Sequence, residues 1–77
     1  MNRNELLALA YDILVNAYPN RLSAREIADI ITQQTGVTIS PRRIRELLKN
    51  ESLTNPHFAK YYVTPNRIKF SVYLYLL

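Results

Sequence analysis

The chain has 77 residues, which is the length of one small domain, and it contains no cysteine. Its formal net charge is +4 at pH 7, and 48% of its residues are hydrophobic, which argues against a disordered chain. The lack of cysteine excludes disulfides and thiolate metal sites, and it fits a reducing cytoplasm. No secretory signal is visible, and no apolar run approaches the roughly 20 residues that a membrane-spanning helix needs.

The positive charge is concentrated in the second half of the chain. Residues 1–39 carry three arginines and four acidic residues, which gives a net charge of −1. Residues 40–77 carry seven basic and two acidic residues, which gives +5. This asymmetry indicates an anionic partner, most often nucleic acid, although charge that only serves solubility would give the same pattern.

The first predicted helix covers residues about 3–18. Asn2 is placed to cap its N-terminus, and Pro19 ends it because the residue before a proline disfavours the helical conformation. Its apolar residues occupy more than one stripe, although a three-helix core needs only one. We therefore expect a second face of this helix to be covered as well.

The second predicted helix covers residues about 24–35. Ser23 and Glu26 have the spacing of a capping box, in which each side chain accepts a hydrogen bond from the other residue's backbone N–H. Gly36 is the expected stop, because glycine adopts a left-handed conformation without steric cost.

The third predicted helix covers residues about 41–50. Ser40 is its expected N-cap, and Pro41 occupies the first helical position, where its fixed φ is already helical. A core stripe with i, i+3, i+4 spacing consists of Ile44, Leu47 and Leu48. The opposite face carries Arg42, Arg45, Glu46 and Lys49, with Arg43 to one side.

Residues about 58–76 change to a two-residue period, which predicts an antiparallel hairpin. Residues 64–67, Thr-Pro-Asn-Arg, would form a four-residue loop around a type I turn, so that Val63 pairs with Ile68. One apolar face would then consist of Ala59, Tyr61, Val63, Ile68, Phe70 and Val72. The other face would carry Phe58, Lys60, Tyr62, Lys69, Ser71 and Tyr73.

Three helices followed by a C-terminal hairpin define a mainly α fold of the α+β class. This arrangement resembles the winged helix-turn-helix DNA-binding superfamily over nearly the whole chain. The resemblance is strongest in residues 21–50, RLSAREIADIITQQTGVTISPRRIRELLKN. It implies one domain of residues 1–77, whose third helix lies in the major groove of double-stranded DNA and whose hairpin is the wing. The linker of residues 36–40 is longer than the turn of the simplest helix-turn-helix proteins, but winged members tolerate this.

The candidate DNA-binding residues follow from this placement. On the third helix they are Ser40, Arg42, Arg43, Arg45 and Lys49, and on the hairpin they are Lys60, Arg67 and Lys69. Ser23 and Arg25 begin the second helix, whose start would meet the phosphate backbone. The first turn of a helix disfavours cations by roughly 0.3–1 kcal/mol each, so an anionic ligand would explain why two arginines stand in the first turn of the third helix.

Each of these assignments has a purely structural alternative. Arg42 and Glu46 have the i, i+4 spacing of a surface ion pair, with Arg43 merely solvated, and Arg25 has the same spacing to Asp29. Lysines on an exposed hairpin also block aggregation without binding a ligand.

Catalysis and metal binding have no support in the sequence. The only histidine, His57, has no partner motif, and the single glycine excludes a glycine-rich phosphate loop. We therefore expect no enzyme activity, no cofactor and no metal. Stacking on single-stranded bases is conceivable for the strand tyrosines, although packing is their commoner role. These are Tyr61, Tyr62, Tyr73 and Tyr75.

The sequence thus predicts a cytoplasmic, nucleoid-associated DNA-binding protein that regulates transcription by occupying its site. One alternative is a winged helix that binds protein, as an adaptor or subunit whose basic face meets an acidic partner. Another is a substrate-positioning domain of a larger nucleic-acid enzyme, because the sequence stops within the apolar run VYLYLL.

A homodimer through residues 3–18 and 70–77 is also expected. The last strand appears apolar on both faces, with Val72, Leu74 and Leu76 on one and Tyr73, Tyr75 and Leu77 on the other. A large apolar patch usually marks an interface, and a dimer would present two third helices to half-sites about one helical turn apart.

Overall fold

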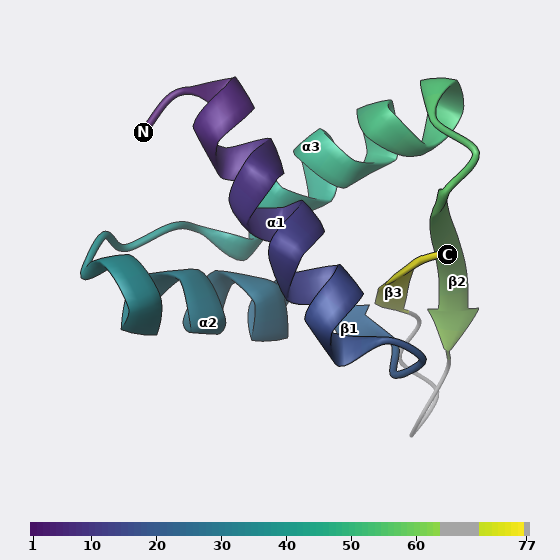
Figure 1. The fold of residues 1–77 in the computed structure, drawn as a ribbon, viewed down its shortest axis with the longest axis horizontal. Helices are drawn as coiled ribbons and strands as arrows, with labels where there is room; N and C mark the ends of the chain where they lie inside the picture. The colour runs from purple at the N-terminus through teal and green to yellow at the C-terminus, as the bar shows by residue number, and fades with distance from the viewer. Residues whose placement is uncertain (64–69, 77) are drawn as a thin grey trace.

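The computed structural model describes residues 1–63 and 70–76, in which three helices pack against one face of an antiparallel sheet (Figure 1). The helices are α1 (Arg3–Ala17), α2 (Ala24–Thr35) and α3 (Pro41–Thr54). The strands are β1 (Leu22–Ser23), β2 (Phe58–Val63) and β3 (Phe70–Tyr75), and their order in the sheet is β1-β3-β2. The predicted mainly α fold of the α+β class is confirmed, and β1 is an addition that the sequence did not reveal.

The helix ends follow local side-chain chemistry. Asn2 caps α1 and Ser40 caps α3. At α2, the Ser23 hydroxyl accepts from the Glu26 N–H at 3.2 Å, and the Glu26 carboxylate accepts from the Ser23 N–H at 3.1 Å. Gly36 ends α2 with a φ of 74°, as expected from its freedom to adopt the left-handed region. The N-terminus of α2 is therefore held rigidly beside β1.

Helix α3 is one turn longer than predicted. It continues past residue 50 to Thr54, because the next residue that opposes helix is Asn55, which precedes Pro56. Ser52 and Thr54 donate hydroxyl hydrogen bonds to backbone carbonyls within the last turn, so these polar residues remain helical. Helix α1 ends one residue before the prediction, at Ala17.

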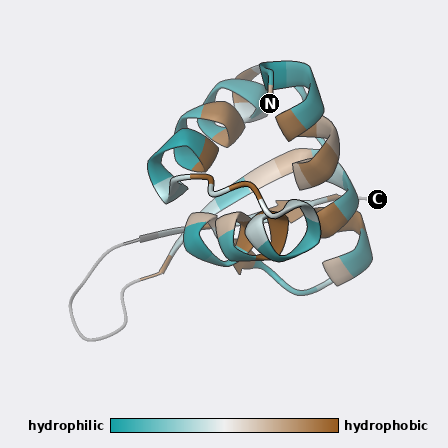
Figure 2. Cartoon of the chain, turned by 90° about the vertical axis from the view of Figure 1, so that its left-hand side faces the viewer, coloured by the Kyte–Doolittle hydropathy of each residue, from teal (hydrophilic) through white to brown (hydrophobic). Residues whose placement is uncertain are grey.

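The core lies between the three helices and one face of the sheet, and the hydrophobic stretches of the helices turn toward it (Figure 2). The largest fully buried side chains come from all three helices, and they are Leu6, Leu14, Ile27, Ile31, Ile44 and Leu48. Phe58 and Tyr73 join them from the sheet, and Tyr75 packs at the edge of the cluster. The helices are thereby fixed against a rigid sheet.

The predicted pairing of the two long strands is wrong by two residues. Val63 pairs with Phe70 rather than Ile68, and Tyr61 pairs with Val72. Side chains alternate between the faces of a strand, so a slip of two residues leaves every side chain on its face. The hydrophobic pattern therefore cannot distinguish the two registers, and the assumption of a short loop chose the wrong one. The predicted turn, residues 64–67, lies outside the described residues.

The predicted roles of the two sheet faces are also different. The face that packs on the helices carries Phe58, Tyr73 and Tyr75, which the sequence pattern had placed opposite the apolar face. Val72 and Leu74 are buried on the other face but do not belong to the helical core cluster. By the alternation of side chains along the strands, the helix-facing side also carries Lys60, Tyr62 and Ser71.

An arginine covers the outer face of the sheet. Arg21 precedes β1, and its guanidinium carbon lies 3.9 Å from the ring centroid of Tyr61 on β2. Because β3 lies between β1 and β2, this contact crosses β3 on the side that carries Val72 and Leu74. Val72, Tyr73 and Leu74 all have less than a tenth of their surface exposed. The expected dimer was argued from exposed apolar faces on this strand, and that reason does not hold at these residues.

Candidate nucleic-acid interface

Two arginines from different helices meet at a hollow beside the sheet. The hollow has a volume of about 360 Å³ and is lined by Ser23, Ala24, Arg25, Arg45 and Ser71. We call this the basic hollow. Its wall is the N-terminal end of α2, whose backbone N–H groups carry the positive end of the helix dipole. Arg25 and Arg45 are exposed, so both guanidinium groups can reach a ligand that enters from solvent.

A wider groove of about 620 Å³ continues from the basic hollow along α2 and α3. Arg25 and Arg45 line both spaces, and Arg42 joins them in the groove together with Ser40 and Asp29. The structure thus brings together residues from the starts of both helices. Asp29 is the acidic residue of this lining, and it forms no ion pair with Arg25 within the described residues.

Within the described residues, no carboxylate pairs with the cations around the basic hollow. Arg25, Arg45 and Lys60 form no ion pair within residues 1–63 and 70–76. Lys60 lies opposite Tyr73 in the sheet register. Burial raises the pKa of the Tyr73 phenol above its ordinary value, and the charges of Lys60 and Arg45 act against this rise. Both charges therefore act on the same buried ring.

Arg42 and Lys49 extend this basic surface along the exposed side of α3. Arg42 also makes the predicted i, i+4 ion pair, with its Nε 3.6 Å from the Glu46 carboxylate. Both side chains are mostly exposed, and such surface pairs contribute less than about 1 kcal/mol. The pair can thus separate when a stronger anion approaches. The Ser40 hydroxyl, in contrast, already accepts the backbone N–H of Arg43 at 3.2 Å as the helix cap.

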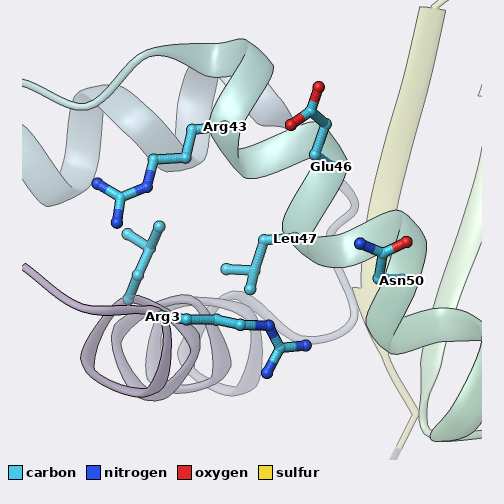
Figure 3. A pocket seen from close by; sticks show the side chains of 6 residues that line it. Arg3, Arg43, Glu46, Leu47 and Asn50 are labelled. Atoms are coloured by element: carbon cyan, nitrogen blue, oxygen red, sulfur yellow. The ribbon is translucent and has the colours of Figure 1, made fainter.

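Arg43 is turned away from the basic hollow. Its guanidinium donates a 2.7 Å hydrogen bond to the backbone carbonyl of Met1. Figure 3 shows Arg43 extending from α3 toward α1 over a hollow of about 190 Å³ that Arg3, Leu6 and Leu47 also line. Its place in the first turn of α3 is therefore explained by a contact with the residue at the start of the chain, before α1, which the sequence pattern did not suggest.

A second link between α1 and α3 lies on the same side of the molecule. The Arg3 guanidinium is 3.3 Å from the carboxylate of Glu51, in the last part of α3. Arg3 and Arg43 thus both connect the start of the chain to α3.

Of the three predicted DNA contacts on the hairpin, only Lys60 lies within the described residues. Lys60 lies on β2, with its ammonium nitrogen 4.9 Å from the ring centroid of Tyr62. Arg67 and Lys69, the other predicted hairpin contacts, lie outside the described residues. Ser71 is the lining residue that sequence reasoning missed, because it was assigned only to a strand face. Side chains two positions apart in a strand lie on the same face of the sheet. If Tyr73 had been recognised as facing the helices, Ser71 would have been placed on that side too.

The described residues offer no candidate metal site and no membrane-spanning helix, and the histidine contacts the end of the last strand. Within residues 1–63 and 70–76, no group of three His, Cys, Asp or Glu side chains is placed to hold a metal ion. In the same part of the chain, no helix is long and apolar enough to cross a membrane. The Nδ1 atom of His57 lies 2.7 Å from the carbonyl oxygen of Leu76, and the ring stacks on Tyr75. His57 therefore has a packing role where the last strand ends.

Comparison with protein-family models, with curated proteins and with solved structures finds no match. The function must therefore be argued from the residues themselves.

Proposed function

We propose that this protein binds double-stranded DNA through the basic hollow and the exposed side of α3, and that it regulates transcription by occupying its site. The proposal rests on Arg25 and Arg45, which line one hollow, and on Lys60, whose charge acts with that of Arg45 on Tyr73. None of these three cations forms an ion pair within residues 1–63 and 70–76. Leaving such charges together is unfavourable unless an anion joins them, and DNA presents a phosphate about every 1.7 Å along its axis.

The order of the elements supports the proposal. Strand β1 lies between α1 and α2 in the chain and pairs with β3, so the start of α2 adjoins the sheet. Three helices followed by a hairpin is the element order that the winged helix resemblance implies, in which α3 would be the recognition helix and the hairpin the wing. The resemblance alone does not decide function, because one fold serves many activities.

The proposed contacts differ in kind. Arg42, Arg45 and Lys49 lie on the side of α3 that would enter the major groove, where arginine reads guanine with two hydrogen bonds. Arg25 and Lys60 flank this helix and would hold phosphates, which position the protein without reading sequence. Arg43 is left out of the proposed interface because it is bound to Met1.

A second candidate function is binding to an acidic protein. Leu53 is 78% exposed, and helical periodicity places it on the same side of α3 as Arg42 and Lys49. An apolar residue on this side suits a protein contact better than a phosphate backbone, although single exposed leucines are common.

Fluorescence anisotropy separates the two candidates. We expect a labelled random-sequence duplex to bind at 50 mM salt and to lose affinity steeply at 200 mM salt. Leu53→Ser is expected to leave this binding unchanged. Absence of duplex binding at 50 mM salt would contradict DNA binding, and it would favour the acidic protein partner.

A further inference from the structure

A highly exposed tyrosine lies beside the basic hollow. Tyr62 on β2 has 57% of its surface exposed. The sheet register places it opposite Ser71, which lines the hollow. It is on the same face as Lys60, whose ammonium lies 4.9 Å from its ring centroid. An aromatic ring and a cation therefore stand together at the edge of the proposed interface.

The other tyrosines of the two strands are placed differently. Tyr73 is only 3% exposed, and Tyr61 lies under the Arg21 guanidinium on the opposite face. Tyr75 packs edge-on against Tyr11 and Phe58, with ring centroids about 5 Å apart. Tyr62 is thus the strand tyrosine that combines a highly exposed ring with a position on the basic side.

We propose that Tyr62 stacks on an unpaired base, so that the preferred ligand is nucleic acid in which a single strand adjoins the duplex. This inference rests on the proposed function and names its ligand more closely. Proteins hold single strands with a cationic groove that follows the phosphates and with aromatic rings on which the bases stack. In a continuous duplex the neighbouring base pairs cover the base faces, so stacking requires an unpaired base.

The sheet register places Tyr62 next to the basic hollow. A phosphate in the basic hollow would be held by Arg25, Arg45 and the Ser71 hydroxyl. Neighbouring strands lie about 4.8 Å apart, so Tyr62 on β2 is one strand away from Ser71 on β3. A base attached to that phosphate would lie over β2, and Lys60 beside the ring would attract the next phosphate.

Two ligands and two substitutions test the inference. The ligands are a blunt duplex and the same duplex with a 3′ tail of six thymidines, each titrated by anisotropy. We expect Tyr62→Ala to lower affinity for the tailed duplex about tenfold, within the range measured for one stacked base, and to leave the blunt duplex unchanged. Tyr62→Phe keeps the ring and is expected to bind both ligands like the wild type.

A fluorescence signal gives an independent measurement. The chain contains no tryptophan, so Tyr62→Trp introduces a single reporter. We expect oligothymidine to quench this tryptophan and the blunt duplex to leave it bright. The matched control is Tyr11→Trp, which places the reporter at a 41% exposed position on α1. Its emission is expected to stay constant, and the reporter also decides the matter if Tyr62→Ala does not fold.

The outcomes separate this inference from the proposed function. Equal losses on both duplexes, or an unquenched Tyr62→Trp in the presence of oligothymidine, would overturn the stacking role while DNA binding stands. If the wild type binds neither duplex, the proposed function and the stacking role fall together.

Discussion

Arg43 and Arg45 lie two residues apart on α3 and point to different parts of the molecule. Arg43 donates to the Met1 carbonyl, whereas Arg45 lines the basic hollow. Side chains two positions apart on a helix diverge by about 200°, so a run of arginines cannot all serve one surface. The sequence pattern placed both in the DNA interface, and only the packing of α1 on α3 distinguishes them.

These two residues form a matched pair for mutation. We expect Arg45→Ala to weaken duplex binding about tenfold, because a specific arginine contact is worth roughly 1–3 kcal/mol. Arg43→Ala is expected to change affinity less than twofold. Its free energy of unfolding should stay within about 0.5 kcal/mol, as for most surface substitutions. Anisotropy and urea denaturation measure the two quantities, and the reverse ranking of affinities would show that the interface lies on the α1 side.

Arg21 is predicted to matter for stability alone. Its guanidinium lies over Tyr61 on the outer face of the sheet, away from the basic hollow. An exposed cation–π contact contributes about 0.5–1 kcal/mol, and the side chain also shields Val72 and Leu74 from water. Arg21→Ala should therefore lower the urea midpoint and leave DNA affinity within twofold. Arg21→Lys serves as the control that keeps the charge but loses the planar group. If Arg21→Ala has the same urea midpoint as the wild type, the contact with Tyr61 does not contribute to stability.

The helices were predicted better from the sequence than the strands were. Helix starts are encoded by a few neighbouring residues, so the caps at Asn2, Ser23 and Ser40 were found with their helices. The hairpin depends on contacts between distant residues, and its register was shifted by two. The sequence also gave no sign of β1, because two residues have no period and Leu22 pairs only once β3 is in place. The basic hollow draws on β1, α2, α3 and β3, so its lining was found only in part.

The turn after α2 offers a test at this scale. Gly36 has a φ of 74°, and a Cβ placed on it would meet no atom within 4 Å. The cost of Gly36→Ala is therefore conformational and not steric, at about 1–2 kcal/mol for an L-residue in the left-handed region. Gly36→Asn should cost less, because asparagine tolerates that region. Urea denaturation measures both variants. Equal stability of the alanine variant and the wild type would contradict the left-handed stop.

Self-association of the whole molecule remains a prediction, and fewer exposed apolar residues support it than the sequence indicated. Strand β3 is central in the sheet, and at Val72 and Tyr73 it is buried and paired on both sides, so these residues offer no open edge to a second copy. Tyr11 on α1 and Tyr18, which caps the end of this helix, are about two-fifths exposed, and Leu76 after β3 is similarly exposed. A dimer through the predicted surfaces, residues 3–18 and 70–77, would have to use these residues.

Sedimentation equilibrium at micromolar concentration tests the dimer. If α1 is the interface, Tyr11→Asp with Tyr18→Asp should convert a dimer to the 9.0 kDa monomer. Arg45→Ala is the control and should leave the mass unchanged. A wild type that is monomeric at all concentrations would exclude the dimer. Each protein would then be expected to bind one DNA site and not a pair of half-sites.

We propose that Arg25, Arg45 and Lys60 act together as a site for nucleic-acid phosphates. Each phosphate contact adds about 0.9 to the slope of log affinity against log salt concentration on B-DNA. The direct test is this slope for the wild type and for the triple alanine variant, measured on one duplex between 50 and 200 mM salt. We expect a steep wild-type slope that becomes shallower by about 3 in the variant, with the melting temperature nearly unchanged. Identical slopes for the two proteins, or a wild-type affinity that does not respond to salt, would contradict it.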